Sequence, residues 1–81
     1  MSTLTDRDRA LLDFAGRWYR FPGAQEQAMR DELDISATTY WRKVNDLIDN
    51  PEALRYAPVT VRRLRRMRQD RLAARSLRRM A

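Results

Sequence analysis

The sequence predicts an all-α protein of three or four helices, the last of which is long and rich in arginine. Apolar residues recur at spacings of three and four, the pattern of one helix face, and proline or glycine separates these stretches. Residues suited to helix N-caps stand before several of them. With 81 residues, one domain is expected over residues 1–81, with a core at about 5–67 and a basic helical extension at about 58–80.

The composition excludes several classes of protein. The chain has no cysteine and no histidine, which removes disulfides, thiol chemistry, the common zinc ligand sets and the usual general base near neutral pH. We therefore expect no metal, no cofactor and no enzyme activity. No apolar run approaches the roughly 20 residues of a membrane span, and the N-terminus lacks the apolar segment of a signal peptide. A cytoplasmic protein with no membrane partner is expected.

The net charge of +6 is distributed unevenly. Residues 1–54 hold 7 basic and 10 acidic residues, whereas residues 55–81 hold 10 arginines and one acid, Asp70. The first part therefore carries −3 and the second +9. Such asymmetry indicates a basic segment with a polyanionic partner.

Thr5 is suited to begin the first helix, because its hydroxyl can cap the chain and acids follow in the first turn. Trp18 and Tyr19 are interpreted as core residues because they continue the apolar face of this helix. The predicted face consists of Leu11, Leu12, Phe14, Ala15, Trp18 and Tyr19.

Phe21-Pro22-Gly23 predicts a break after the first helix. A second helix at about 24–33 has few apolar residues and needs support from its neighbours. Ser36 then stands at the N-cap position of a third helix at about 37–49. The helical spacing predicts an inner face for this third helix that is made of Tyr40, Val44, Leu47 and Ile48.

The segment MRDELDISATTYWRKVN resembles the general bacterial helix-turn-helix pattern. The matching positions are Met29, Leu33, Ile35, Ser36, Thr39, Tyr40 and Val44. Arg30 replaces a small residue of the pattern, and Asp34 replaces the glycine that takes a left-handed turn. Aspartate tolerates that conformation better than most residues. The resemblance implies a helix-turn-helix core whose recognition helix spans residues 37–49.

The whole chain also resembles a family of small, uncharacterised actinobacterial proteins. The similar segments are TDRDRALLDFAGRWY, GAQEQAMRDELDISATTYWRKVNDLID, PEAL and RRLRRMRQDR. This resemblance covers nearly all of the chain and implies a fold and an origin. It implies no activity, so the functional interpretation depends on the residues.

Residues 51–54 are expected to form a short turn or a single helical turn, with Leu54 and Tyr56 folded back on the core. Pro58 suits the first turn of a fourth helix at about 58–79. The residues of this helix that can face the body are Val61, Leu64 and Met67. Continued in helical steps, the same stripe meets Arg68, Arg71 and Arg75. Because a buried unpaired guanidinium is costly, contact with the core is expected to stop at about 67–72.

Two groups of residues are candidates for nucleic-acid contacts. The outer face of the third helix is predicted to contact DNA bases or grooves through Thr38, Thr39, Trp41, Arg42, Lys43 and Asn45. The fourth helix is predicted to bind phosphates through Arg62, Arg63, Arg65, Arg66 and Arg68. A solvated helix face is the alternative for each group. For the fourth helix, the solvated face is the weaker interpretation, since solvated helices usually interleave acidic and basic residues.

Two other classes of function remain as alternatives. Asp31, Glu32 and Asp34 lie close together in sequence, but their spacing does not converge on one helical face, so a magnesium-dependent enzyme is disfavoured. A protein-interaction module is the main alternative: the basic helix would dock on an acidic protein such as a subunit of the transcription machinery, or two copies would form a homodimer.

The predicted function is therefore DNA binding, by a small transcriptional regulator or a nucleoid-associated factor. Its partner would be double-stranded DNA, held by the recognition helix and by the arginine-rich helix acting as a phosphate clamp.

Overall fold

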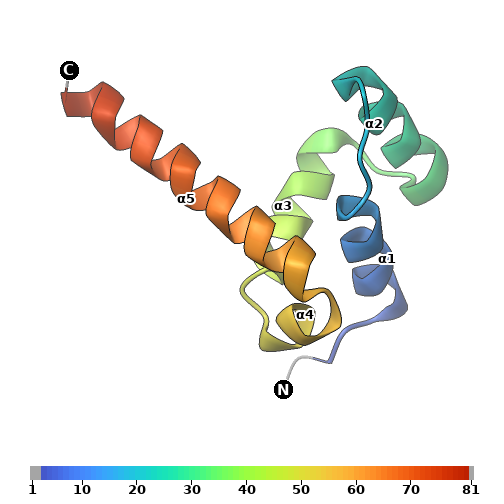
Figure 1. The fold of residues 1–81 in the computed structure, drawn as a ribbon. Helices are drawn as coiled ribbons and strands as arrows, with labels where there is room; N and C mark the ends of the chain where they lie inside the picture. Colours follow the sequence, from blue (N-terminus) through green and yellow to red (C-terminus); the bar gives the residue numbers. More distant parts are fainter. Residues whose placement is uncertain (1–2, 81) are drawn as a thin grey trace.

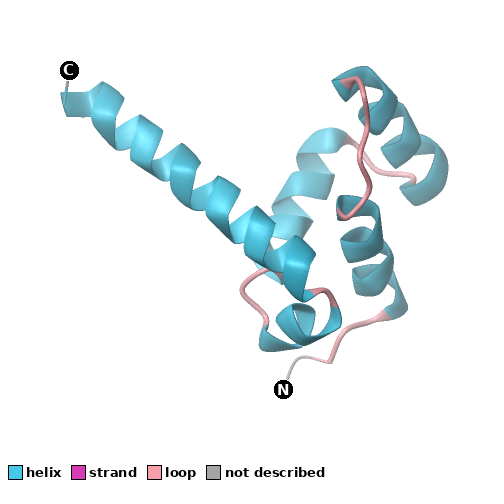
Figure 2. Ribbon diagram, in the orientation of Figure 1, coloured by secondary structure: helices cyan, strands magenta, loops and turns pink. Residues whose placement is uncertain are grey.

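The computed structural model describes residues 3–80, and within these residues every regular element is a helix (Figure 2). The elements are α1 (Asp6–Ala15), α2 (Pro22–Ala28), the π-helix η1 (Met29–Leu33), α3 (Ala37–Leu47), α4 (Pro51–Tyr56) and α5 (Pro58–Met80). The elements before α5 form a body, and the far half of α5 projects away from it (Figure 1). The all-α class and the long final helix are confirmed.

The N-terminus of α1 is capped as its sequence predicts. The Thr5 hydroxyl accepts a hydrogen bond from the Asp8 N–H at 3.0 Å, and the Asp8 carboxylate accepts one from the Thr5 N–H at 3.0 Å. This reciprocal pair satisfies two amides that lack a partner within the helix. Local sequence alone therefore determines where α1 begins.

α1 ends at Ala15, earlier than its apolar pattern predicts. Gly16 follows as the C-cap, and its N–H donates back to carbonyls of the last turn. A Cβ on Gly16 would lie 3.1 Å from the Thr60 hydroxyl oxygen. The absence of a side chain at Gly16 therefore lets the start of α5 lie directly beside the end of α1.

Trp18 does not belong to the core, and its prediction as a core residue was wrong. Because the helix stops at Ala15, Trp18 leaves the apolar face of α1, and 82% of its surface is exposed. Tyr19 is half-buried and packs against the core, with its ring centroid 5.6 Å from that of Phe14. The apolar spacing of the sequence continues through Trp18 and Tyr19, but the chain forms a loop at these residues.

The segment that leads into α3 contains the left-handed turn expected from the helix-turn-helix resemblance. α2 begins at Pro22, before the predicted start at residue 24, and the π-helix η1 continues it to Leu33. Asp34 follows with a φ of 54°, the only positive φ of a non-glycine residue within residues 3–80. The Ser36 hydroxyl then accepts a hydrogen bond from the Thr39 N–H at 3.3 Å and caps α3.

α4 is a helix where a turn or a single helical turn was expected, so residues 3–80 contain more helices than the three or four predicted. The Asn50 side chain caps it by accepting a hydrogen bond from the Glu52 N–H at 2.9 Å. Ala53 is fully buried, and Leu54 packs against the core. Tyr56 remains exposed, contrary to expectation, because its hydroxyl donates to the Asp13 carboxylate at the surface, at 2.9 Å.

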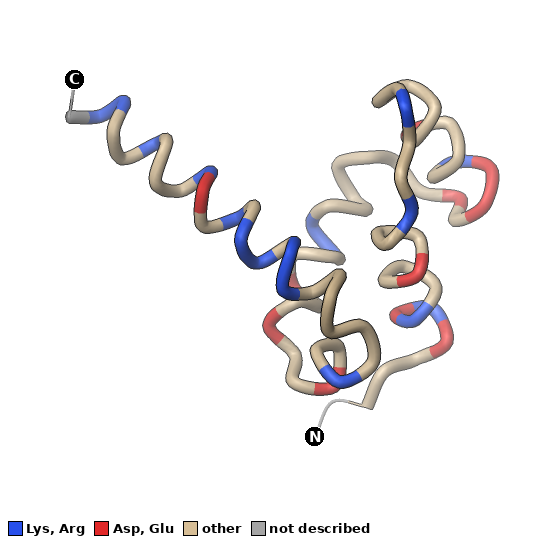
Figure 3. Tube along the Cα trace, viewed as in Figure 1, with Lys and Arg blue, Asp and Glu red and all other residues tan. Residues whose placement is uncertain are grey.

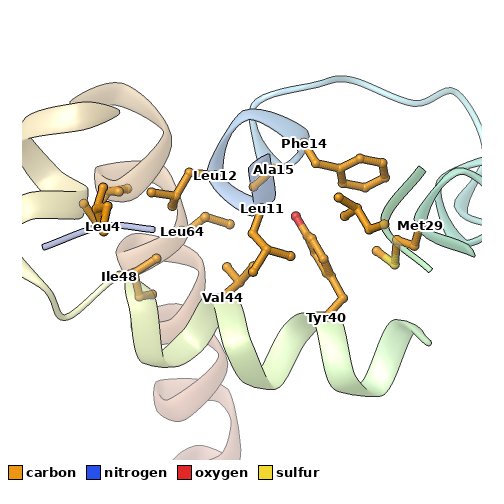
Figure 4. Close-up of a cluster of buried hydrophobic side chains, with 13 residues drawn as sticks. Leu4, Leu11, Leu12, Phe14, Ala15, Met29, Tyr40, Val44, Ile48 and Leu64 are labelled. Carbon is orange, nitrogen blue, oxygen red and sulfur yellow. The ribbon is translucent and has the colours of Figure 1, made fainter. Parts of the chain in front are cut away.

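The core lies between α1, η1, α3 and the first turns of α4 and α5 (Figure 4). Tyr40, Val44 and Ile48 of the predicted inner face are buried, and Leu47 is half-buried. Phe14 packs edge-on against Tyr40, with ring centroids 5.4 Å apart. The predicted inner face of α3 is therefore confirmed.

α5 contributes to this core only through its first turns. Val61 and Leu64 are buried, but Met67 is 43% exposed and no residue beyond it belongs to the core. The core contact of α5 therefore ends at Leu64, about one turn earlier than the expected 67–72, and Met67 is not a core residue. Within residues 3–80, no helix has the length and apolarity required to cross a membrane.

Candidate functional site

The six side chains predicted to contact DNA bases or grooves lie in three different situations on α3. Thr38, Arg42 and Lys43 are exposed and make no hydrogen bond or ion pair with another described side chain. Thr39 is half-buried and belongs to the N-cap, since its N–H and its hydroxyl both bond to the Ser36 hydroxyl, at 3.3 and 3.1 Å. Thr39 is therefore less available to a ligand than its neighbours.

Trp41 and Asn45, the other two predicted contacts, lie at the edge of α3 that faces α5. Trp41 packs edge-on against Tyr40, with ring centroids 4.9 Å apart, and remains 37% exposed. The Asn45 side-chain oxygen accepts a hydrogen bond from Arg68 at 3.3 Å. The outer face of α3 is thus divided between an exposed strip and an edge that is shared with α5.

Two of the five arginines predicted to bind phosphate hold α5 on the body. Arg63 donates to the Ala15 carbonyl and Arg65 to the Ile48 carbonyl, both at 2.6 Å. These carbonyls stand at the C-terminal ends of α1 and α3, where helices have unsatisfied acceptors and attract cations. The role of Arg63 and Arg65 in the fold could not be read from their position in an arginine-rich stretch.

Arg68 also contacts the protein itself. Its guanidinium donates two hydrogen bonds to the Asp49 carboxylate, at 2.7 and 3.1 Å, just beyond the end of α3. These bonds and the positive charge lower the pKa of Asp49 and raise that of Arg68. The Arg68 side chain is 33% exposed and that of Asp49 63% exposed, so the pair contributes little to stability, and it joins α5 to the residue that follows the end of α3.

The remaining arginines of α5 have no partner within residues 3–80. Arg62 and Arg66 are exposed on the face opposite Leu64, and the far half of the helix adds Arg71, Arg75, Arg78 and Arg79. Figure 3 shows these basic residues recurring along the projecting helix, whereas acidic residues gather on the body. The five arginines predicted as one clamp therefore do not share one face.

A cleft of about 400 Å³ lies between α3 and α5. Its apolar lining consists of Trp41, Val44, Ile48, Leu64, Met67 and Leu72. Its polar lining consists of Arg42, Asn45, Arg68, Arg71 and Arg75. We call it the α3–α5 cleft; it contains three of the predicted groove-contact residues and one of the predicted phosphate-binding residues.

A second hollow, of about 500 Å³, adjoins the first and is called here the loop hollow. It shares Trp41, Leu64 and Met67 with the α3–α5 cleft and extends to Trp18 and Phe21 of the loop between α1 and α2. The sequence did not indicate that Trp18, Phe21, Met67 and Leu72 would line a surface site. The available signal was the Phe21-Pro22-Gly23 break next to Trp18, and the arginines that replace apolar residues on the inner stripe of the fourth helix beyond Met67.

The carboxylates considered for metal binding each have a different environment. Asp31 accepts a hydrogen bond from the Gln27 amide at 3.0 Å, Glu32 pairs with Arg17 at 2.6 Å, and Asp34 occupies the left-handed turn. Among the described residues, no three acids, histidines or cysteines are close enough together to hold a metal ion. Asp31 and Glu32 thus make separate surface contacts with Gln27 and Arg17, and the three acids do not form one site.

Comparison with protein families gives one match. A family model described as a protein of unknown function (DUF3263) matches residues 3–76. Because the match covers most of the chain, the protein belongs to this family. No curated protein and no solved structure matches the chain. The expectation of an uncharacterised family is confirmed, whereas the actinobacterial origin and the helix-turn-helix resemblance stay predictions.

Proposed function

We propose that this member of the DUF3263 family binds double-stranded DNA, as a small transcriptional regulator or a nucleoid-associated factor in the cytoplasm. α3 would enter or approach the major groove, as in a helix-turn-helix protein, and α5 would lie along the phosphate backbone. No chemical step is required of the protein, since binding itself would be its function.

The unneutralised charge of α5 is the observation that carries this proposal. The helix holds nine arginines and one acid, Asp70, and Arg68 alone among these arginines has an ion-pair partner within the described residues. Like charges that stand along one helix repel each other, and a polyanion relieves that repulsion. Duplex DNA does so with a regular array of phosphates and releases bound counterions.

The contacts proposed here differ from the clamp that the sequence predicted. Because Arg63, Arg65 and Arg68 hold α5 on the body, the phosphate contacts are assigned first to exposed arginines without a partner. On the outer face these are Arg62 and Arg66, and at the tip they are Arg78 and Arg79. On α3, base or groove contacts are assigned first to Thr38, Arg42 and Lys43.

The test is the salt dependence of binding to a fluorescein-labelled duplex of random sequence, measured by anisotropy with the full chain. We expect micromolar or tighter binding that weakens steeply between about 50 and 200 mM salt. Replacing Arg62 and Arg66 with Gln should lower the slope of log K against log salt by about 2, since each lost phosphate contact removes about one unit. Replacing Arg78 and Arg79 with Gln should have the same effect.

The matched control is the double replacement of Arg30 and Arg55 with Gln, which removes two charges from η1 and α4. If this control lowers the slope as much as the α5 variants do, binding depends on net charge alone and the assigned contacts are wrong. Lys43→Ala examines α3 in the same assay: a reading helix requires weaker binding with an unchanged circular dichroism spectrum. Absence of binding by the unmodified chain at about 50 mM salt would refute the proposal as a whole.

A further inference from the structure

The exposed large apolar side chains of the protein are concentrated around one region. Eight such residues lie within the described part of the chain, and five of them line the α3–α5 cleft or the loop hollow. The five are Trp18, Phe21, Trp41, Met67 and Leu72. Contiguous exposed apolar surface of this kind is typical of an interaction site, whereas single exposed apolar residues are ordinary.

The residues that line the α3–α5 cleft are buried at one end and exposed at the other. At one end, Ile48, the C-cap residue of α3, and Leu64 of α5 are buried in the core (Figure 4). At the other end, Leu72 is 51% exposed and Arg75 is also exposed, where the far half of α5 projects away from the body (Figure 1). The cleft thus has a mixed apolar and basic lining that runs from buried to exposed residues, so an elongated ligand can lie along it.

The charged residues that line the α3–α5 cleft all carry positive charge. Its lining contains four arginines and no acid. The Asp49 carboxylate neutralises Arg68, which leaves Arg42, Arg71 and Arg75 without a partner in residues 3–80. A ligand of this cleft therefore has to present apolar groups to the floor and negative charge to the rim.

We infer that the α3–α5 cleft binds an acidic amphipathic helix of a partner protein. The apolar face of such a helix covers Trp41, Met67 and Leu72, and its flanking carboxylates pair with Arg71 and Arg75. This is the helix-in-groove mode of recognition, in which side chains at positions i, i+3 or i+4, and i+7 are the anchors. Arginine and carboxylate groups form strong paired hydrogen bonds at the rim.

The dimensions of the cleft agree with such a ligand. Its lining on α5 runs from Leu64 to Arg75, which is about 16 Å along a helix axis and corresponds to about three helical turns. Three turns present three or four anchor positions on one face. A volume of about 400 Å³ accepts several side chains of a helix, but it does not accept a nucleic-acid duplex.

Two other occupants are less compatible with this surface. Duplex DNA satisfies the arginines but offers no apolar group for Trp41, Met67 and Leu72. The α5 helix of a second copy would bring nine more arginines against the arginine rim, and α1 and α3 already bury their own apolar faces. Charge and apolarity together therefore select an acidic, amphipathic partner.

This inference does not depend on DNA binding. It uses the inner face of α5, with Arg71 and Arg75, whereas the proposed phosphate contacts use the outer face and the tip of the helix. Arg42 belongs to both surfaces and is therefore not used as a test residue. The two proposals can fail separately.

The experiment measures binding of the full chain to two labelled synthetic peptides by fluorescence anisotropy. The first has about 16 residues, with leucines at i, i+3, i+4 and i+7 and with glutamates and alanines elsewhere. The second has the same composition, but its leucines are distributed around the helix. We expect the first peptide to bind at least about tenfold more tightly than the second, since only one face can enter the cleft.

Two cleft variants and two matched controls locate the binding. Leu72→Ser, and separately Arg71→Gln with Arg75→Gln, should each weaken binding of the first peptide by about tenfold or more, as for central interface residues. The controls, Leu77→Ser and Arg62→Gln with Arg66→Gln, change an exposed leucine and two arginines outside the cleft and should leave peptide binding within about twofold.

Several outcomes would overturn the inference. Equal binding of both peptides, or equal losses in the cleft variants and the controls, would mean that attraction between net charges explains the binding. No binding at about millimolar peptide would mean that the cleft does not take an acidic helix. If the cleft variants lose affinity for duplex DNA and keep their affinity for the peptide, nucleic acid is the occupant instead.

Discussion

The two halves of α5 have nearly the same composition and different physical roles. In the first half, Val61 and Leu64 are buried, and Arg63 and Arg65 donate to carbonyls at the ends of α1 and α3. In the second half, Leu72 and Leu77 are exposed and the arginines beyond Arg68 have no partner in the described residues. The first half of α5 therefore packs against the body of the protein, and the second half is exposed to solvent.

The comparison shows that the role of an arginine depends on what lies opposite it. Arg65 and Arg66 are neighbours in the sequence, but Arg65 faces the Ile48 carbonyl and Arg66 faces solvent. A guanidinium that meets a helix C-terminus satisfies orphan acceptors and interacts with the helix dipole. A guanidinium in solvent contributes little to stability and remains available for a ligand.

The largest expected difference between the halves concerns their leucines. Leu64→Ala should lower the free energy of unfolding by about 2–5 kcal/mol, because it leaves a cavity under α5. Leu72→Ala should change it by less than about 0.5 kcal/mol, since the side chain is already half-exposed. Urea denaturation followed by circular dichroism measures both. Equal losses would mean that the far half of α5 packs against the body.

The adjacent arginines give a smaller and more direct test. Arg65→Ala should cost about 1–2 kcal/mol of stability, because the Ile48 carbonyl at the end of α3 loses a charged donor. Arg66→Ala removes the same charge from the same helix and should cost less than about 0.5 kcal/mol. Thermal unfolding of the pair of variants decides between the two roles. Comparable melting temperatures would show that the contact of Arg65 contributes nothing.

The smallest expected effect is a pH dependence at the boundary between the halves. The Arg68 guanidinium lowers the pKa of Asp49 in the folded protein, so this pair stabilises the fold above the unfolded-state pKa of about 4. That contribution is lost as pH falls through the lower pKa of the folded state. Asp49→Asn should therefore lower the melting temperature slightly at pH 7, and the difference from the unmodified protein should vanish in acid.

The control for this pH dependence is Asp70→Asn, because Asp70 lies in the far half of α5 and has no ion-pair partner within residues 3–80. Its melting temperature should follow that of the unmodified protein at every pH. A difference between Asp49→Asn and the unmodified protein that persists at pH 2 would assign the effect of Asp49 to something other than its charge.

Several features of the fold follow from residues that are close together in sequence. Thr5 and Asp8 determine the start of α1, and Ser36 determines the start of α3. Asp34 takes the left-handed turn expected of it. The inner face of α3 follows from the spacing of its apolar residues. Caps, turns and helical periods act over three or four residues, so the sequence displays them directly.

The candidate site was predicted only in part, for a physical reason. The arginines were recognised as a basic helix, but the sequence did not distinguish the ones that hold the fold from the ones that are free. The exposed position of Trp18 was missed because the apolar period continued past the end of α1. The cleft was not predicted, since its two walls come from α3 and α5.

The sequence alone therefore determined the helical class, the caps, the inner face of α3 and the excess of charge at the C-terminus. Tertiary structure decided which arginines are free, where α1 stops and which apolar residues gather at the surface. The acceptor of Arg65 lies 17 residues away along the chain, and that of Arg63 lies 48 residues away. Such partners are chosen by packing, because a side chain's role depends on the groups that the folded chain brings within hydrogen-bonding distance of it.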